Sequence, residues 1–290
     1  MFNQSFTSYL ILNGILREDQ SANVLKIARE TRVRVGVLAV ESGLLTVEDV
    51  EKINMLQSSQ NAKFGDIAVG RGYMTKDQFD SLLTKQPKPH VILKQILTDK
   101  AYMSAERFED LMRGFQASLG ASDEAFARIK DNDAQAFVEF AAKVGEDNFM
   151  LNTFASLFIS TVTRLVDGDI LVKAAEKLDS AKLTHFFEQP GVGGGNSYKF
   201  CFGTNDEKAA LWFAEKYCRF SVNDMDGDGQ DSLKEFLNCV SGMMIGVLSN
   251  SGKAEIDIEV GEYSKGKDIS YDALMVPFVL PAGEFYLTVL

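Results

Sequence analysis

The residues of this chain whose types and spacing could do chemistry lie between Asp224 and Asn238, and this stretch fits two templates. Read forward, it has the spacing D-x-D-x-D-G-x5-E of a calcium-binding loop, with Glu235 as the last ligand. Read from its other end, it is a helix that carries Glu235 and Asn238 three residues apart and therefore on one face. Such a pair could hold a charged group of a partner protein and orient a water molecule. Both templates require Glu235.

The calcium template predicts a ligand set made entirely of oxygen atoms, as Ca²⁺ requires. The ligands would be Asp224, Asp226, Asp228, the backbone carbonyl of Gln230, Ser232 and Glu235. Asp231 stands at the loop position that is normally apolar, and the sequence contains no second loop of this kind. The same aspartates could also cap the following helix and complement its dipole without any metal.

The helical template divides residues 231–245 into two opposed arcs at 100° per residue. The apolar arc, which must face a core, consists of Leu233, Phe236, Leu237, Val240 and Met244. The opposite arc consists of Asp231, Glu235, Asn238 and Gly242. A solvated surface explains a Glu and an Asn, but a glycine within a helix costs about 1 kcal/mol relative to alanine. Gly242 therefore suggests that the backbone of another protein comes close to this face.

The overall composition excludes several classes of function. The 290 residues include 30 Lys plus Arg against 41 Asp plus Glu, a formal charge of −11. A DNA-binding protein that neutralises phosphates would need clustered cations, which we do not find. No signal sequence or apolar stretch long enough to span a membrane is present, and the three cysteines lack metal-ligand spacing. We expect a cytoplasmic protein without membrane insertion, whose cysteines are small buried hydrophobes.

An internal repeat with a period of about 29 residues occupies positions 34–116. In each unit a short helix is predicted to end at a glycine, Gly43 or Gly72, where a left-handed residue closes the helix. A hydroxyl residue then caps the next helix, as the matching positions Thr46, Thr75 and Ser104 indicate. One unit is too small to bury its own apolar face, so the copies are expected to pack on each other.

The remainder of the chain predicts an α+β fold. Helices are expected at 149–166, from Asn205 or Asp206 through Tyr217, and up to about Leu248. Strands are expected at 184–189, 198–203, 254–260, 273–280 and 283–289, with a connection through 190–195 between the first two. We predict three parts: an all-α helical repeat domain (1–120), a helical connector (121–147) and an α+β domain (148–290) with an antiparallel sheet and packed helices.

The repeat units resemble the N-terminal MshEN domain of type II secretion and pilus ATPases, whose units read R-x-G…G…T…L…Q. Some members of that family bind cyclic di-GMP through such units, so the resemblance implies a nucleotide site in this part of the chain. Its residues would be Arg34, Gly36, Gln57, Lys63, Gly65 and Gln86. The opposite possibility is a helical adaptor without a ligand.

The chemistry-bearing helix resembles a second family more specifically. Asp231-x3-Glu235-x2-Asn238 matches the D/S-x3-E-x2-N signature of the CheX, CheC and FliY chemotaxis phosphatases. The following Asn238-Cys-Val-Ser-Gly resembles the N-x3-G helix of that family, and residues 273–285 resemble its closing hairpin. The resemblance covers about residues 148–290.

The resemblance implies a phosphatase, or a docking module derived from one, that acts on the aspartyl phosphate of a response regulator. Asn238 would orient the attacking water, Glu235 would pair with a lysine of the regulator, and Asp231 and Gly242 would take part in docking. Magnesium would belong to the regulator, so this chain would need no cofactor, and a homodimer is what the family suggests. A single site is expected, because helix 149–166 carries no second E-x-x-N. The alternative is a non-catalytic adaptor that binds calcium or a cyclic dinucleotide.

Overall fold

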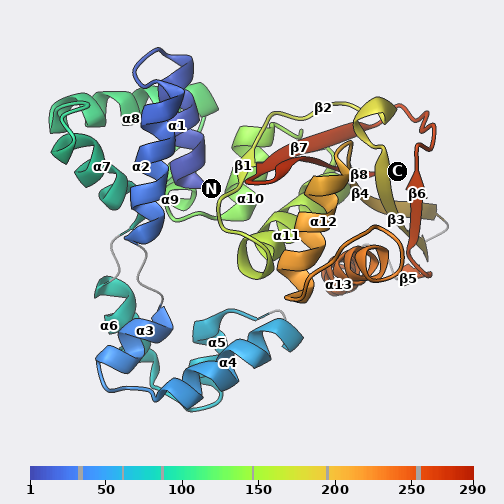
Figure 1. Ribbon diagram of the computed structural model, residues 1–290, viewed down its shortest axis with the longest axis horizontal. Coiled ribbons are helices and arrows are strands. Elements are labelled where there is room, and N and C mark those ends of the chain that lie inside the picture. The colour runs from blue at the N-terminus through green and yellow to red at the C-terminus, as the bar shows by residue number, and fades with distance from the viewer. Residues whose placement is uncertain (32–34, 61, 86–87, 146, 194–195, 253–255) are drawn as a thin grey trace. The chain divides into compact units, whose positions relative to one another are not determined.

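The computed structural model describes residues 1–290 apart from 32–34, 61, 86–87, 146, 194–195 and 253–255 (Figure 1). The described residues form two compact units, which we treat separately. The helical unit comprises residues 6–114, and the mixed unit comprises residues 1–5 together with 115–290. As the sequence predicted, helical repeats precede a region of mixed helix and antiparallel sheet.

Eight helices make up the repeat region. They are α1 (Phe2–Leu12), α2 (Glu18–Glu30), α3 (Val35–Glu41), α4 (Val47–Gln60), α5 (Phe64–Gly70), α6 (Lys76–Lys85), α7 (Pro89–Asp99) and α8 (Ala105–Leu119). The same turn joins the two helices of each successive pair. Its first residue has a positive φ and stands at position 14, 43, 72 or 101. In every copy this residue donates its N–H to the carbonyl three residues back, and the next residue donates to the carbonyl five residues back.

The structure thus contains four copies of the repeat, one more than the sequence indicated. The additional copy is α1–α2, whose turn begins at Gly14 (φ 68°). The predicted caps are present: Thr46, Thr75 and Ser104 each accept a backbone N–H three residues on, at 3.1–3.2 Å. Arg17 stands at the corresponding position of the first copy, and it has no hydroxyl, which is why the cap pattern did not reveal that copy.

Glycine in the two middle copies permits close helix packing. A Cβ added at Gly36 would lie 2.8 Å from Cγ1 of Val50, and one at Gly65 would collide with the ring of Phe79. The first helix of each middle copy therefore approaches the second with no room for a side chain. Around these contacts lies a shared core of α3–α6, formed by Ala39, Leu45, Ile53, Ile67, Ala68, Met74 and Leu82.

The mixed unit contains helices and one antiparallel sheet. After α8 come α9 (Asp123–Lys130), α10 (Ala134–Phe137), a π-helical turn (Val138–Ala142), α11 (Phe149–Leu165), α12 (Glu207–Cys218) and α13 (Asp228–Asn250). The strands are β1 (Leu171–Val172), β2 (Glu176–Lys177), β3 (His185–Gly193), β4 (Asn196–Thr204), β5 (Ile256–Ile258), β6 (Glu262–Lys265), β7 (Leu274–Leu280) and β8 (Gly283–Val289).

Within the described residues the sheet has eight strands in the order β1-β7-β8-β4-β3-β5, with β2 also on β7 and β6 also on β3. Every pair is antiparallel. Two expectations from the sequence were wrong. Residues 190–193 belong to β3 rather than to a connection, and β6 follows β5 as a separate strand. Pro190 fits within the strand because its carbonyl accepts the N–H of Glu259 at 2.9 Å, a bond that needs no donor from proline.

A cluster of aromatic rings joins the sheet to α11, α12 and α13, which lie on the same side of it (Figure 1). Phe158 of α11 is at its centre, with ring centroids 5.0 Å from Phe236 of α13, 5.1 Å from Phe202 of β4 and 5.8 Å from Phe278 of β7. Edge-to-face and tilted pairs of this kind add to the burial of apolar area. The cluster fixes α13 against the sheet through one face, which leaves the opposite face outside.

Candidate functional site

The site is built on α13, which begins abruptly at Asp228 after a tight turn. The N-cap residue Gly227 has φ 62°, a conformation that glycine adopts without strain. The N–H of Asp226 donates to Oδ1 of Asp224 at 3.1 Å, which closes the turn. A Cβ at Gly229 would collide with the carbonyl oxygen of Asp224, so the glycine of this motif is required by the fold itself.

The apolar arc that the sequence predicted is buried and the opposite arc is exposed. Leu233, Phe236, Leu237, Val240 and Met244 are all fully buried, with 0% of their surface accessible. Asp231, Glu235, Asn238 and Gly242 are exposed. Among the described residues, neither the side chain of Glu235 nor that of Asn238 has a hydrogen-bond or ion-pair partner. The structure therefore presents a carboxylate and an amide to solvent on a helix that is anchored from behind.

Asp231 is engaged within α13. Its Oδ1 lies 2.7 Å from Nζ of Lys234, with side-chain exposures of 71% and 31%. Lys234 precedes Asn238 by four residues, so the two side chains are neighbours along one side of the helix. Sequence reasoning missed Lys234 because the phosphatase signature places no requirement on its position. The helical spacing to Asn238 was the available signal.

The carboxylate of Glu235 is close enough to Tyr217 of α12 to act on its pKa. Burial raises the pKa of Tyr217 to about 12, and the charges of Cys239 and Glu235 act in the same direction. Burial likewise raises the pKa of the Cys239 thiol, with Glu235 contributing, while Arg164 of α11 acts against it. The thiol next to the site is therefore protonated near neutral pH and is a poor nucleophile. Of the cysteines, only Cys201 is fully buried, whereas Cys218 and Cys239 are half-buried rather than buried as expected.

Gly242 has no internal reason to be glycine. A Cβ added there would meet no atom within 4 Å, and the same is true of Gly246 one turn later. Both positions are exposed within α13. An alanine would stabilise the helix, so the bare backbone at Gly242 is consistent with the predicted approach of another protein.

The carboxylates of the calcium template do not assemble around a common point. Among the described residues there is no group of three or more Asp, Glu, His or Cys side chains that could hold a metal ion. The reason is the early start of α13: from Asp228 onward the chain is helical, so Asp228, Gln230 and Glu235 follow the helix instead of wrapping around an ion. Calcium binding by Asp224, Asp226 and these residues stays a prediction that the geometry does not favour.

Three of the residues predicted to bind a nucleotide have structural contacts in the described part of the chain. Gly36 and Gly65 are buried at helix contacts, and Nε2 of Gln57 donates to the carbonyl of Ala62 at 3.4 Å. Lys63 is exposed at the start of α5. Arg34 and Gln86 lie outside the described residues. The predicted cyclic di-GMP site and the resemblance of 34–116 to the MshEN domain stay predictions.

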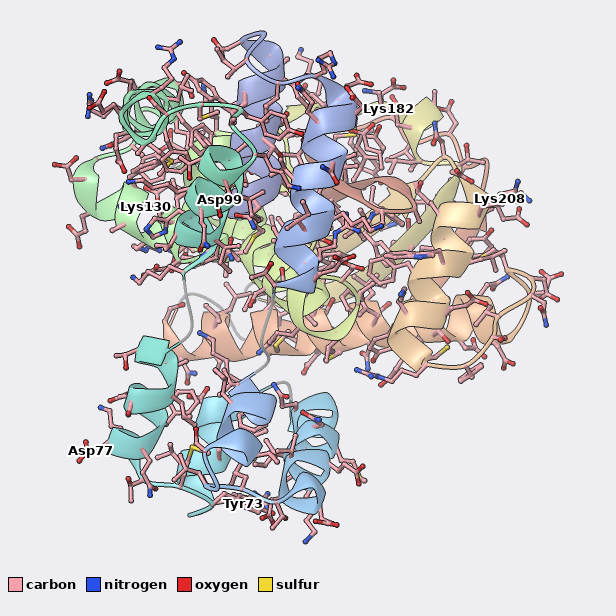
Figure 2. All side chains as sticks on the ribbon, turned by 60° about the vertical axis from the view of Figure 1, so that its left-hand side comes forward. Tyr73, Asp77, Asp99, Lys130, Lys182 and Lys208 are labelled. Atoms are coloured by element: carbon pink, nitrogen blue, oxygen red, sulfur yellow. The ribbon has the colours of Figure 1, made fainter. Side chains whose placement is uncertain are left out.

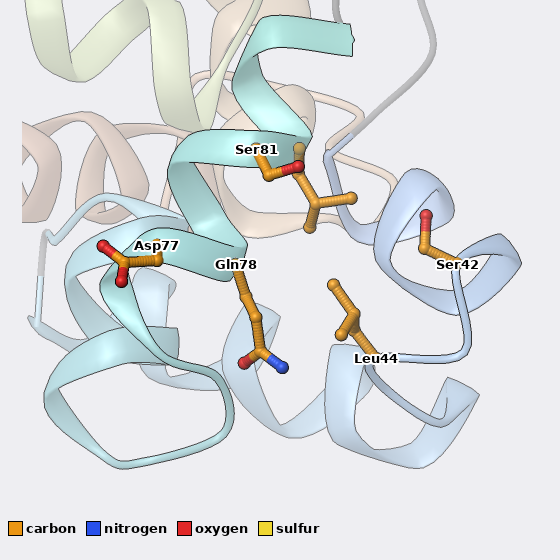
Figure 3. A pocket seen from close by; sticks show the side chains of 6 residues that line it. Ser42, Leu44, Asp77, Gln78 and Ser81 are labelled. Carbon is orange, nitrogen blue, oxygen red and sulfur yellow. The ribbon is translucent and has the colours of Figure 1, made fainter.

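An open pocket of about 380 Å³ lies between the end of α3 and the start of α6 (Figure 3). Leu44 and Leu82 form its apolar part, and Ser42, Asp77, Gln78 and Ser81 form its polar part. None of the residues predicted to bind a nucleotide lines it.

No protein-family model and no curated protein sequence matches the chain. Solved structures of chemotaxis proteins do match it, over about half of its length and in the C-terminal part. CheX of Vibrio vulnificus is 17% identical, with 48% of this chain and 97% of that chain covered and a TM-score of 0.42. A CheC-like superfamily protein of Shewanella sp. PV-4 is 19% identical, with 50% and 97% covered and a TM-score of 0.44.

A third similar structure is CheX of Borrelia burgdorferi in a CheX–CheY–BeF3–Mg²⁺ complex. It is 21% identical, with 48% of this chain and 95% of that chain covered and a TM-score of 0.39. These structural similarities concern the same C-terminal part of the chain for which the sequence indicated a resemblance. In the part of the chain that the structure describes, no helix has the length and apolar character needed to cross a membrane.

Proposed function

We propose that this protein accelerates the hydrolysis of the aspartyl phosphate of a response regulator through Glu235 and Asn238 of α13. The observation that carries the proposal is that both side chains are exposed and have no partner among the residues that the structure describes, on a helix whose other face is held in an aromatic core. The E-x-x-N spacing with Asp231 before it is the sequence pattern of aspartyl-phosphate phosphatases, as described above.

The proposed chemistry needs positioning rather than covalent participation by this chain. The amide of Asn238 holds a water molecule in line with the phosphorus atom, and an amide does this in one protonation state across the physiological pH range. The water oxygen forms a bond to phosphorus while the bond from phosphorus to the aspartyl oxygen breaks. The electron pair stays on the regulator's carboxylate, inorganic phosphate leaves, and one proton of the water passes to solvent.

Glu235 sets the docking register in this proposal. Its exposed carboxylate pairs with a lysine beside the regulator's phosphorylation site, and Gly242 lets the regulator's backbone approach α13. Magnesium is held by the regulator, where it neutralises phosphoryl charge. The fixed position of α13 matters because a displacement of the amide by about 1 Å would misplace the water.

Asn238→Ala tests the catalytic role directly. We expect the accelerated loss of phosphate from a phosphorylated response regulator of the same organism to fall about 100-fold in kcat, because the water loses its positioning group. Glu235→Gln is expected to raise KM more than it lowers kcat. The measurement is the decay of radiolabelled phosphoryl regulator at several concentrations of each variant.

Asn250→Ala is the matched control, since it removes another exposed asparagine amide from the last turn of the same helix. It should behave like the wild-type protein. Equal dephosphorylation by the wild-type and Asn238→Ala proteins would exclude the catalytic assignment. A loss of activity in both asparagine variants would point to a change in the helix rather than in the chemistry.

A further inference from the structure

The surroundings of Asn238 pose an electrostatic problem for a phosphoryl group. The turn and first half of α13 carry the carboxylates of Asp224, Asp226, Asp228, Asp231 and Glu235. These add to the formal charge of −11 of the whole chain. An approaching phosphoryl group is itself anionic, and like charges at contact distance disfavour association. The regulator's magnesium offsets part of the phosphoryl charge, and a cation on this face of α13 would offset the carboxylates of this chain.

Lys234 is the one cation in the sequence of α13, and it lies on the side of the helix where Asn238 lies. Its Nζ is 2.7 Å from Oδ1 of Asp231, and its side chain is 31% exposed. Side chains on a helix incline toward its N-terminus, so the amide of Asn238 extends over the turn that contains Lys234. Lys234 and Asn238 are therefore neighbouring positions on one side of α13, and the ammonium of Lys234 lies at Asp231, one turn toward the N-terminus.

Fold stability does not account for this arrangement. Exposed ion pairs three or four residues apart in a helix contribute little, and many contribute nothing measurable. Phosphoryl transfer, by contrast, is accelerated by cations aimed at the oxygens where charge is concentrated. Lysine serves this purpose as a compact charge on a flexible stem that can exchange one anionic partner for another.

We propose that Lys234 is a phosphoryl-contacting residue of the site: Asp231 holds its ammonium on this face of α13, one turn from Asn238, until the partner's phosphoryl oxygens replace that carboxylate. This inference rests on the proposed function and adds to it the group that recognises the phosphoryl itself. Lys234 makes no covalent bond and transfers no proton. It lowers the energy of the anionic phosphoryl group as water attacks.

The test compares Lys234→Met and Lys234→Arg with Lys208→Met. Lys208 is an exposed lysine of α12 in the same unit (Figure 2), so its replacement removes the same charge away from the site. Lys234→Met should lower kcat/KM for the phosphorylated regulator about 10- to 100-fold, the range for a lost hydrogen bond to a charged group. Lys234→Arg should restore most of the activity, and Lys208→Met should retain all of it.

A binding measurement accompanies the kinetics, with the regulator free or loaded with beryllofluoride as a phosphoryl mimic. Lys234→Met should lose the preference for the loaded regulator while its affinity for the free regulator is unchanged. Lys234→Met equal to Lys208→Met in both assays would overturn the inference about Lys234. The proposed function would still stand if the wild-type protein dephosphorylates the regulator and Asn238→Ala does not. A wild-type protein that neither dephosphorylates nor binds any regulator would overturn both.

Discussion

Polar and charged residues of this protein have two distinct environments, one exposed and one buried. Glu235 and Asn238 are exposed and without partners in the described part of the chain, so they contribute little to folding and are available to a partner protein. Glu188 of β3 is the opposite case. Only 4% of its side chain is exposed, and its two oxygens lie 2.7 Å from Nζ of Lys199 and 2.9 Å from Nζ of Lys267.

The buried Glu188 predicts a pH-dependent stability. Burial favours the neutral acid, but the hydrogen bonds and charges of Lys199 and Lys267 outweigh it and hold the pKa of Glu188 below its ordinary value. A carboxyl whose pKa is lower in the folded than in the unfolded protein stabilises the fold above the unfolded pKa. We expect Glu188→Gln to lower the free energy of unfolding by about 1–3 kcal/mol at pH 7.

The difference between Glu188→Gln and wild type should shrink as the pH falls below about 4.5 and through the folded pKa, where the wild-type carboxylate is protonated as well. Urea unfolding monitored by Trp212, the one tryptophan of the sequence, measures this in the mixed unit. Glu176→Gln, in the more exposed pair with Lys182 of the same unit, is the control and should change little. A constant difference from pH 7 to pH 3 would contradict the assigned charge state.

At the scale of the element, α13 combines an anchored face with an exposed face that carries the residues of the proposed site. The anchored face packs against α11, α12 and the sheet, with Phe236 in ring contact with both Phe158 and Phe213 at 5.0 Å. The exposed face begins in the first two turns of α13 and includes Gly242. The fold does not require a glycine there, because an added Cβ would meet no atom within 4 Å. Stability and docking thus place opposite demands on position 242.

Gly242→Ala should therefore stabilise the protein and impair its activity. We expect the free energy of unfolding to rise by about 0.5–1 kcal/mol, because alanine is the better helix former and its Cβ meets no internal atom. Phosphatase activity should fall at the same time, since the added methyl group holds the regulator away from α13. Gly246→Ala is the matched variant: it should give the same gain in unfolding free energy. Full activity of Gly242→Ala would remove Gly242 from the docking surface.

At the scale of the whole molecule, the start of the chain belongs to the unit that holds its end. Phe2 is fully buried, its N–H donates to Oδ1 of Asn132 at 2.7 Å, and its ring contacts Phe115 edge-to-face. The N-terminal ammonium donates to the carbonyl of Gly168 at 3.3 Å. The predicted division into 1–120, 121–147 and 148–290 stays a prediction, but the compact units do not follow sequence order.

Phe2→Ala tests whether the first residues of the chain stabilise the mixed unit. Removing a fully buried ring should cost about 3–5 kcal/mol, and Trp212 should report the loss because both residues belong to the mixed unit. Leu12→Ala in the same helix is the control, since 83% of Leu12 is exposed. Unchanged urea unfolding of Phe2→Ala, as seen by Trp212, would show that the first residues do not stabilise this unit.

The sequence by itself determined the features that depend on near neighbours. The two arcs of α13 follow from helical periodicity, and the caps at Thr46, Thr75 and Ser104 follow from hydroxyls three residues from the N–H groups they satisfy. Glu235 and Asn238 could be assigned to one exposed face for the same reason. These caps and helix faces involve residues only three or four positions apart in the sequence, so the order of the residues is enough to predict them.

Only the tertiary structure decided the features that join distant segments. β1 is a strand because Leu171 and Val172 pair with Val279 and Phe278, and nothing in two residues predicts such a partner. The burial of Glu188 depends on β4 and on the loop that carries Lys267. The calcium motif is complete in the sequence, but α13 begins at Asp228 and carries the later ligands along its axis, so calcium binding stays a prediction that this geometry does not favour. A ligand pattern specifies residue types, whereas the packing of the helix decides where their oxygens point.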